Sequence, residues 1–311
     1  KFAQRIGANP QRARSVHIRH SPNYHEGKFR NPVETNMALT PGLLETMMGE
    51  MLKGGAGREP KDVIPAVPFN KGVWETLPNN GMAVAWFGHS SLLIKLDGIT
   101  VLTDPVFGER ASSFSFAGPK RFAYTEHMRT ELLPRVDVVL LSHDHYDHLC
   151  CETMVELARS STLPMPRFIV PLGAGAHLEK WGVPPSSITE KDWWGNTEER
   201  SVKFTLAPSR HFSGRGLTNR FSTLWGSWVL QGRSKKIYFG ADSGYSPVFK
   251  EVGKRFGPFD LAFLECGAYN KNWPNIHMFP EQTAQAAVDV QARLLMPSHW
   301  LTVAIALAVL T

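Results

Sequence analysis

The sequence predicts one mixed α/β domain preceded by an N-terminal extension, and three observations lead to this. Strand-like runs of apolar residues recur from Met82 onward. Helix-like patterns lie among them at Glu152–Arg159 and Pro280–Gln291. The 26 glycines, 22 prolines and 9 tryptophans favour a loop-rich, β-containing fold over a helical bundle. With 311 residues, of which 42% are apolar, the chain is long enough to enclose a full core.

The expected strands are apolar segments separated by turn residues. Met82–Gly88 is the first, and Ser91–Asp104 predicts a hairpin because Asp97-Gly98 is a favoured two-residue turn between β-rich arms. Further strands are expected at Val136–Leu141, Arg167–Val170, Val202–Ala207, Thr223–Leu230, Lys236–Phe239, Leu261–Leu264 and Arg293–Met296.

Residues 1–80 form a polar segment of irregular pattern with one helix-like stretch. Between Val33 and Lys53, Met and Leu recur at helical spacings. Pro41 suits the first helical position, Thr40 suits the N-cap, and glycines follow from Gly54. We therefore expect an N-terminal extension with a helix over residues 1–80 and the main domain over residues 81–311.

Charge and cysteine content restrict the partners and the compartment. The net charge of +6 indicates a basic surface that is either simply solvated or attracts phosphate-bearing partners. No dense Lys/Arg run appears, which argues against nucleic acid. Three cysteines, Cys150, Cys151 and Cys266, do not make a disulfide framework, and no apolar run reaches the ~18 residues of a membrane span. The expected location is cytoplasmic or peripheral on a membrane.

The strongest motif is "LLSHDHYDHL", residues 140–149. It places His143, His145, Asp147 and His148 directly after the apolar strand "VDVVLL". A helix would be a poor host, because residues two apart diverge around it, whereas a loop at a strand end can direct all four side chains to one point. Imidazole and carboxylate groups together suit zinc, and iron or manganese less exclusively.

Three more metal-type residues follow strand-like segments: His211 after "VKFTLAPSR", Asp242 after "KKIYFGA" and His299 after "RLLMPS". Singly, each has another explanation, as a loop histidine, a turn former or a core histidine. Seven ligands exceed one tetrahedral zinc but fit two ions that share a carboxylate. The natural division assigns one ion to His143, His145 and His211. It assigns the other ion to Asp147, His148 and His299, and Asp242 bridges the two ions.

The motif, its order and the strand-end positions resemble the metallo-β-lactamase superfamily. The resemblance implies an αββα sandwich of two mixed β-sheets flanked by helices, with the metals at one edge, so that residues 81–311 would be a metallo-β-lactamase-like hydrolase domain.

Longer segments, several of which have no metal role, resemble one family within it, the N-acylphosphatidylethanolamine-hydrolysing phospholipase D family. They are Thr103–Phe122, Asp192–Trp194, Leu224–Leu230, Gly240–Tyr245 and Gly253–Asn270. The resemblance implies two zinc ions on the seven residues above. It also implies hydrolysis of a phospholipid to phosphatidic acid and an N-acylethanolamine by a metal-bridging hydroxide, with Asp147 and Asp242 as catalytic residues. The expected partner is a phospholipid at a membrane surface, not nucleic acid, and a homodimer is possible.

Some positions keep two interpretations. His277, in "IHMFPEQ", resembles a family histidine that meets the phosphate or leaving group, and it is equally explained as a neighbour of the last helix's N-terminus. His89 and Asp104 are expected to support the ligands. Asp144 stands where the family often has Asn, at a position that is not a ligand. The tail "LTVAIALAVLT" does not match the family.

Other functions remain open from the sequence alone. A lactonase, nuclease or sugar-phosphate hydrolase would use the same scaffold with a small polar pocket. A di-iron redox protein is less favoured, because such relatives usually carry Glu at the position of His145. A binding protein that has lost activity conflicts with the complete set of ligands.

Overall fold

The computed structural model describes residues 2–35, 60–216 and 218–300. Two six-stranded mixed sheets make up its centre. In chain order, the first contains β3 (Met82–Trp86), β4 (Leu92–Leu96), β5 (Ile99–Thr103), β6 (Val138–Leu140), β7 (Arg167–Pro171) and β8 (Ile188–Lys191). The second contains β9 (Asn196–Glu199), β10 (Val202–Ala207), β11 (Ser227–Gln231), β12 (Lys236–Phe239), β13 (Leu261–Glu265) and β14 (Leu295–Ser298).

In both sheets, antiparallel strands are followed in chain order by parallel ones. Strands β3, β4 and β5 pair antiparallel, and β6, β7 and β8 then add in parallel. In the second sheet β9 to β12 pair antiparallel, and β13 and β14 add in parallel. The carboxyl ends of the parallel strands lie at a common edge of each sheet, which is where ligands usually bind in such sheets.

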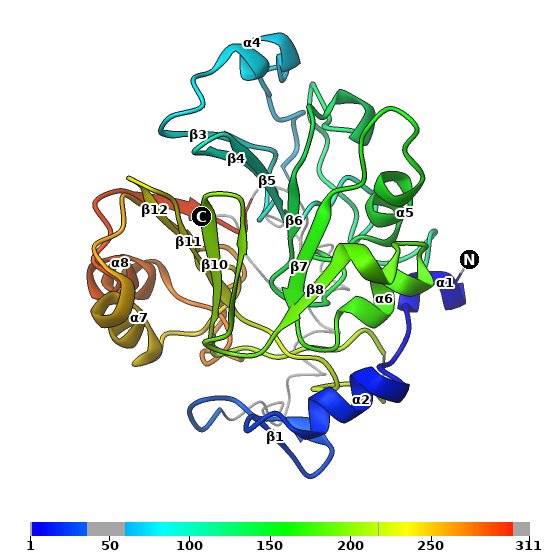
Figure 1. Ribbon diagram of the computed structural model, residues 1–311, viewed down its shortest axis with the longest axis vertical. Coiled ribbons are helices and arrows are strands. Elements are labelled where there is room, and N and C mark those ends of the chain that lie inside the picture. The colour runs from blue at the N-terminus through cyan, green and yellow to red at the C-terminus, as the bar shows by residue number, and fades with distance from the viewer. Residues whose placement is uncertain (1, 36–59, 217, 301–311) are drawn as a thin grey trace.

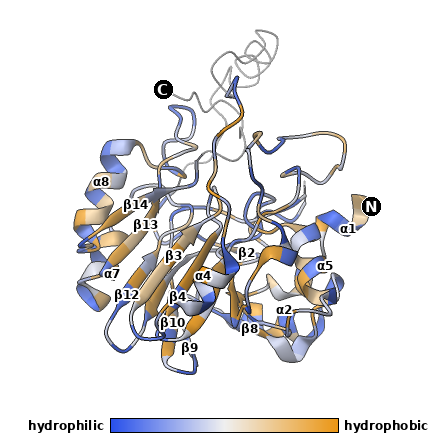
Figure 2. Cartoon of the chain, turned by 90° about the horizontal axis from the view of Figure 1, so that it is seen from above, coloured by the Kyte–Doolittle hydropathy of each residue, from blue (hydrophilic) through white to orange (hydrophobic). Residues whose placement is uncertain are grey.

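Helices cover the outer face of each sheet (Figure 1). Helices α5 (Cys151–Arg159) and α6 (Gly175–Lys180) pack on the first sheet, and α7 (Val248–Phe256) and α8 (Pro280–Asp289) on the second. Between the sheets lies a third apolar cluster, to which β4 contributes Leu92 and Ile94, while Leu93 faces the helices. Both faces of the strands are therefore buried, and Figure 2 shows them as predominantly hydrophobic. The predicted αββα sandwich is confirmed.

The structure contains elements that the sequence pattern did not reveal. Strands β8 and β9 stand at the ends of their sheets, where the polar sequences "ITEK" and "NTEE" pair on one side only. The one helix expected in residues 1–80 lies mainly outside the described residues, but the described part of this segment contains other elements. Residues 2–35 and 60–80 hold three short helices and two short strands: α1 (Phe2–Ile6), α2 (Arg12–Arg19), α4 (Lys71–Thr76), β1 (Tyr24–His25) and β2 (Lys28–Phe29). These helices bury one residue each or none, so they lack a clear apolar stripe.

The helix expected to begin at Pro41 falls mainly on residues 36–59, outside the described residues, as does the tail 301–311. The division at residue 80 stays a prediction. No helix within the described ranges combines the length and apolar character needed to cross a bilayer.

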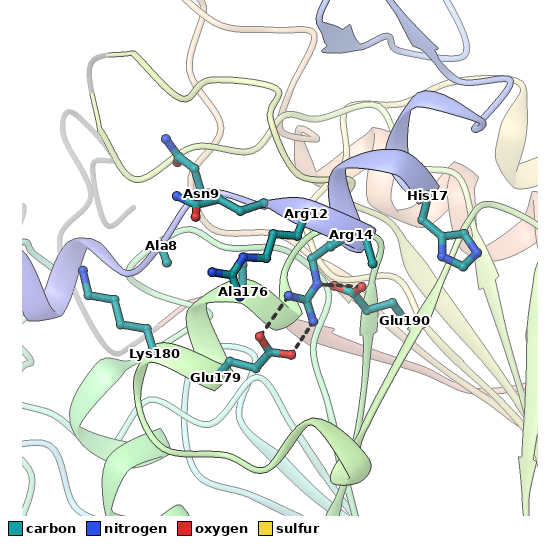
Figure 3. Close-up of a pocket in the computed structure, with 11 residues that line it drawn as sticks. Ala8, Asn9, Arg12, Arg14, His17, Ala176, Glu179, Lys180 and Glu190 are labelled. Carbon is teal, nitrogen blue, oxygen red and sulfur yellow. Dashed lines mark hydrogen bonds and ion pairs between the residues drawn. The ribbon is translucent and has the colours of Figure 1, made fainter.

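One half-buried cation connects α2 to the first sheet. Arg14 donates to both carboxylate oxygens of Glu190 on β8, at 2.9 and 2.8 Å, and to Glu179 on α6 at 2.8 Å. Figure 3 shows its guanidinium between the two carboxylates, inside a hollow of about 640 Å³. Because the guanidinium of Arg14 already pairs with both carboxylates, we interpret this hollow as the packing interface between the N-terminal residues and the sandwich, and not as a ligand site.

We predict that Phe204→Ala lowers the free energy of unfolding by about 3–5 kcal/mol, since it removes a fully buried ring from between the sheets. Chemical denaturation followed by circular dichroism measures the shift. The control Val288→Ala removes a side chain that is 70% exposed on α8 and should change stability by less than about 0.5 kcal/mol. Equal midpoints for the two variants would contradict this arrangement of the core.

Candidate metal centre

All seven predicted ligands lie just beyond the carboxyl ends of strands. His143, His145, Asp147 and His148 occupy the loop after β6. The other three follow strands of the second sheet: His211 after β10, Asp242 after β12 and His299 after β14. Since the sheets pack face to face, these ends meet, and residues from both sheets converge on one buried site.

Three imidazoles form the first group. His145 Nδ1 lies 2.9 Å from His143 Nε2 and 3.2 Å from His211 Nε2. Nitrogens bound to one tetrahedral zinc at about 2.0–2.1 Å would be about 3.3 Å apart. The spacing is therefore close to what a single ion between these three atoms requires.

The second group contains Asp147, His148 and His299. The Nε2 atoms of His148 and His299 lie 3.6 and 3.5 Å from Asp147 Oδ2. Both also lie 3.1 Å from Asp242 Oδ1. The structure thus brings the second predicted set together as well.

Asp242 stands between the two groups. Its Oδ1 faces His148 and His299, whereas its Oδ2 lies 3.6 Å from His211 Nε2 and 3.9 Å from His143 Nε2. One carboxylate thus directs an oxygen to each side, as a bridging ligand would. The assignment of each residue to an ion stays a prediction.

Unsatisfied polar atoms indicate that a cation belongs here. Among the described residues, His148 Nε2, His299 Nε2 and Asp242 Oδ1 are buried without a hydrogen bond of good geometry. Such atoms are costly to bury unless another group meets them. The chemistry of the donors and this lack of partners fit a pair of bound metal ions.

The electrostatics agree with this. Burial lowers the pKa values of His143 and His211 well below the usual imidazole range, which keeps these rings neutral, as metal ligands must be. Burial opposes the ionisation of Asp242, but His148 and His299 hold its pKa well below the ordinary range. Burial also disfavours a charged His299, yet Asp242 and Asp147 raise its pKa to about 10. The site therefore favours positive charge beside Asp242.

Supporting groups fix the orientation of the ligands. Asp104 Oδ2 accepts a hydrogen bond of 2.5 Å from the Ser142 hydroxyl and lies 2.7 Å from His148 Nδ1. Ser142 Oγ is in turn 2.9 Å from His143 Nδ1, and the Ile276 carbonyl is 3.0 Å from His211 Nδ1. These contacts leave the opposite nitrogens of the rings for a metal.

His89 lies against the second group. Its Nε2 is 3.0 Å from Asp147 Oδ2, and burial lowers its pKa to about 4. A neutral ring at this distance donates to the carboxylate. This position matches the supporting role expected for His89.

Two buried residues hold the motif loop in shape. The Asp144 carboxylate accepts from Gly214 N at 2.7 Å and Thr223 Oγ1 at 2.9 Å, and lies 3.2 Å from His177 Nε2. Arg215 donates from one nitrogen to the carbonyls of Asp144 and Leu149, both at 2.7 Å. Sequence reasoning missed Arg215, because a lone arginine in "SGRGL" belongs to no recognisable pattern.

His277 lies beside both groups. Its ring centre is 5.2 Å from that of His211 and 5.3 Å from that of His299. Its Nδ1 is 3.3 Å from Oε2 of Glu265, a fully buried carboxylate at the end of β13. His277 is therefore part of the wall of the centre, and not only a neighbour of α8. Glu265 was missed in the sequence, where "FLEC" reads as the end of a strand.

The backbone around the centre is strained. His89, Asp104, Ala241 and His299 adopt positive φ angles of 52°, 33°, 48° and 64°. Such values are uncommon for residues other than glycine and tend to gather at functional sites. Gly267 contributes in another way, because a Cβ there would lie 1.6 Å from the His299 carbonyl oxygen. The close approach of these two segments therefore requires glycine.

We predict that His143→Ala and His299→Ala each retain about one metal ion per chain after dialysis, whereas the unmodified protein retains about two. Each variant removes a ligand from one group and leaves the other complete. Elemental analysis of folded, purified protein measures the ratio. Retention of two ions by both variants would show that the groups are not separate sites.

A second prediction concerns Asp104→Asn. The amide oxygen of the new side chain can still accept a hydrogen bond from Ser142. His148, however, loses the negatively charged carboxylate beside its Nδ1, so metal affinity should fall by about 10–100-fold. Competition with a chelator measures this affinity. Asp62→Asn, a change at an exposed residue, serves as the matched control and should leave it unaltered.

Comparison with known proteins identifies the family. The model of the beta-lactamase superfamily domain matches residues 100–300. An uncharacterised protein of Mycobacterium tuberculosis is 40% identical over 299 residues, covering 95% of this chain and 78% of its own. The N-acyl-phosphatidylethanolamine-hydrolyzing phospholipase D 1 of Caenorhabditis elegans is 34% identical over 231 residues, which are 71% of this chain and 64% of that protein.

Solved structures agree on the fold. A metallo hydrolase from Ignicoccus hospitalis superposes with a TM-score of 0.53 at 18% identity, covering 70% of this chain and 82% of that one. The chain belongs to the beta-lactamase superfamily, as a metal-dependent hydrolase of the metallo-β-lactamase fold related at moderate identity to the N-acylphosphatidylethanolamine-hydrolysing phospholipases D.

Proposed function

We propose that this protein is a dinuclear zinc phosphodiesterase of phospholipase D type. It hydrolyses N-acylphosphatidylethanolamine-like phospholipids to phosphatidic acid and an N-acylethanolamine. The observation that carries the proposal is the arrangement of two ligand groups on either side of Asp242. The similarity to the Caenorhabditis elegans phospholipase D, which extends over 71% of this chain, supports the choice of substrate.

The described residues of the centre differ in their exposure. His145, Tyr146 and Asp147 are partly exposed, whereas His143, His148, His211, Asp242 and His299 are buried. A phosphodiester would therefore approach past the middle of the motif loop.

Two zinc ions held by these ligands would lower the pKa of a water molecule to near 7 and offset the charge that develops on the phosphoryl oxygens. The carboxylates of Asp242 and Asp147 supply the negative charge that retains the ions. Asp147 is kept in position by His89, at 3.0 Å. In the reaction, the water oxygen bonds to phosphorus and the bond from phosphorus to the ethanolamine oxygen breaks.

We propose that His277 meets the leaving group. Its Nδ1 faces Glu265 Oε2 at 3.3 Å, although the two atoms do not form a hydrogen bond of good geometry, so we propose Nε2 as the nitrogen that meets a substrate. The departing alkoxide needs a proton, and a histidine at the wall of the centre can supply a hydrogen bond to that oxygen. We assign His277 this role, with Glu265 positioning its ring.

We predict that Asp147→Asn stays folded and lowers turnover of N-acylphosphatidylethanolamine in mixed micelles by about 100-fold or more, equivalent to about 2.7 kcal/mol of transition-state stabilisation. Product analysis by mass spectrometry should find phosphatidic acid and N-acylethanolamine in equal amounts. The control Asp62→Asn should retain full turnover.

The same assay separates the alternatives. A lactone panel, a water-soluble phosphodiester and a sugar phosphate are offered to the zinc-loaded protein alongside the phospholipid. Turnover of lactone or sugar phosphate with none of the phospholipid would overturn the proposed substrate while leaving a hydrolase. Undiminished turnover by Asp147→Asn would show that this carboxylate has no role in the reaction.

A further inference from the structure

Three phenylalanine rings form an exposed cluster at one edge of the molecule. Phe2, Phe114 and Phe116 are 49%, 42% and 78% exposed. The rings of Phe2 and Phe114 stack at 4.8 Å between centres, and those of Phe114 and Phe116 lie at 5.5 Å. Single exposed apolar side chains are common, but adjacent exposed aromatic rings point to a binding surface. We call these three residues the aromatic surface.

The segment that carries two of these rings is held in place. Residues 110–120 form a closed loop whose ends pair at Arg110 and Lys120, and Arg110 donates to the Gly118 carbonyl at 2.7 Å. From α1, Arg5 donates to the carbonyls of Ser112 and Phe114 at 3.2 and 3.0 Å. Residues 114–118 are nevertheless all exposed. The rings are therefore presented to solvent on a hydrogen-bonded support.

This loop adjoins the solvent-facing side of the metal centre. Ser113 lies next to Tyr146, which stands between the ligands His145 and Asp147. Arg5 connects the two regions a second time, because its carbonyl accepts from Arg215, the residue that holds the motif loop. A partner bound to the aromatic surface would lie next to the side from which a substrate enters.

The charges around the loop suit an anionic surface. Arg110, Lys120 and Arg121 flank it together with Arg5, and the neighbouring carboxylates are Glu109, which lies 3.2 Å from the Lys120 ammonium, and Glu152, which pairs with Arg5. Cations therefore outnumber anions here, as they do over the whole chain, at +6. Phenylalanine next to basic residues is typical of side chains that insert at the interface of an anionic bilayer.

We infer that the aromatic surface docks the protein on an anionic lipid bilayer and so brings the metal centre to substrate that lies in the membrane. The role in catalysis rests on the proposed phospholipid substrate, but the docking itself does not. A bilayer can be bound by a few inserted rings, whereas a specific protein interface needs about 800 Å² per partner, far more than these three partly exposed side chains offer.

The test is sedimentation with vesicles of phosphatidylcholine containing phosphatidylglycerol, using the zinc-loaded full chain. We expect the double variant Phe114→Ser/Phe116→Ser to partition about tenfold or more weaker than the unmodified protein, because it removes two insertable rings. Pure phosphatidylcholine should bind more weakly than the mixed vesicles. Val288→Ser/Leu294→Ser is the matched control, because these residues are 70% and 63% exposed at and just after α8, on the side of the molecule opposite α1 (Figures 1 and 2). This control should bind vesicles normally.

Turnover of a water-soluble phosphodiester by the Phe114→Ser/Phe116→Ser variant should remain unchanged, because neither ring belongs to the centre, while turnover of vesicle-borne substrate falls. Equal vesicle binding by the variant and the unmodified protein would overturn the inference, as would no binding at all. If the variant instead separates a dimer and binds vesicles normally, the surface joins two copies and the inference is wrong. Vesicle binding that depends on the rings, without phospholipid turnover, would refute the proposed substrate alone.

Discussion

A single buried carboxylate determines the geometry of the centre. Asp242 is 3% exposed and lies 3.1 Å from two imidazoles on one side and 3.6 and 3.9 Å from two on the other. An ionised carboxylate in such a place is stable only if positive charge compensates it. The imidazoles around it differ in their pKa shifts for this reason. Those nearest its Oδ1 are held towards the charged form, and those of the first group stay neutral. Two metal ions would satisfy both sides at once.

The sandwich keeps these groups together through buried donors that cross between its layers. Trp228, on the second sheet, donates to the carbonyl of Leu141 at 2.8 Å, two residues before the ligand His143. Arg215 then fastens the loop at Asp144 and Leu149. Each of these contacts satisfies a backbone carbonyl that has no strand partner, so the loop is fixed without regular structure. Asp104 is the corresponding support directly beneath the ligands.

The sequence revealed the ligands because their pattern depends only on local chemistry. Histidines two apart after an apolar strand indicated a loop, and the recurrence of metal-type residues at strand ends indicated convergence. The supporting residues were harder. Glu265 contacts a residue 12 positions away in the sequence, and Arg215 contacts residues 66 to 210 positions away. No local sequence pattern predicts such contacts. Strand ends were also imprecise, since Thr223–Gly226 was expected in a strand but leads into β11 as a loop that meets Asp144.

The polar edge strands and short N-terminal helices escaped prediction for a different reason. Strands β8 and β9 gain their structure from pairing with neighbours, and α1 and α2 gain theirs from docking on the sandwich through Arg5, Arg14 and Arg215. Tertiary contacts outweigh weak local propensity in each case. Arg5 and Arg14 therefore tie to the sandwich a segment that the sequence alone presented as a loosely patterned extension.

The presence of two ions around Asp242 is the central claim, and anomalous diffraction at the zinc absorption edge tests it most directly. A crystal of the zinc-loaded protein should show two peaks about 3.5–4 Å apart. One should lie among His143, His145 and His211, and the other among Asp147, His148 and His299, with Asp242 between them. A single peak, or a pair that does not share Asp242, would contradict this account.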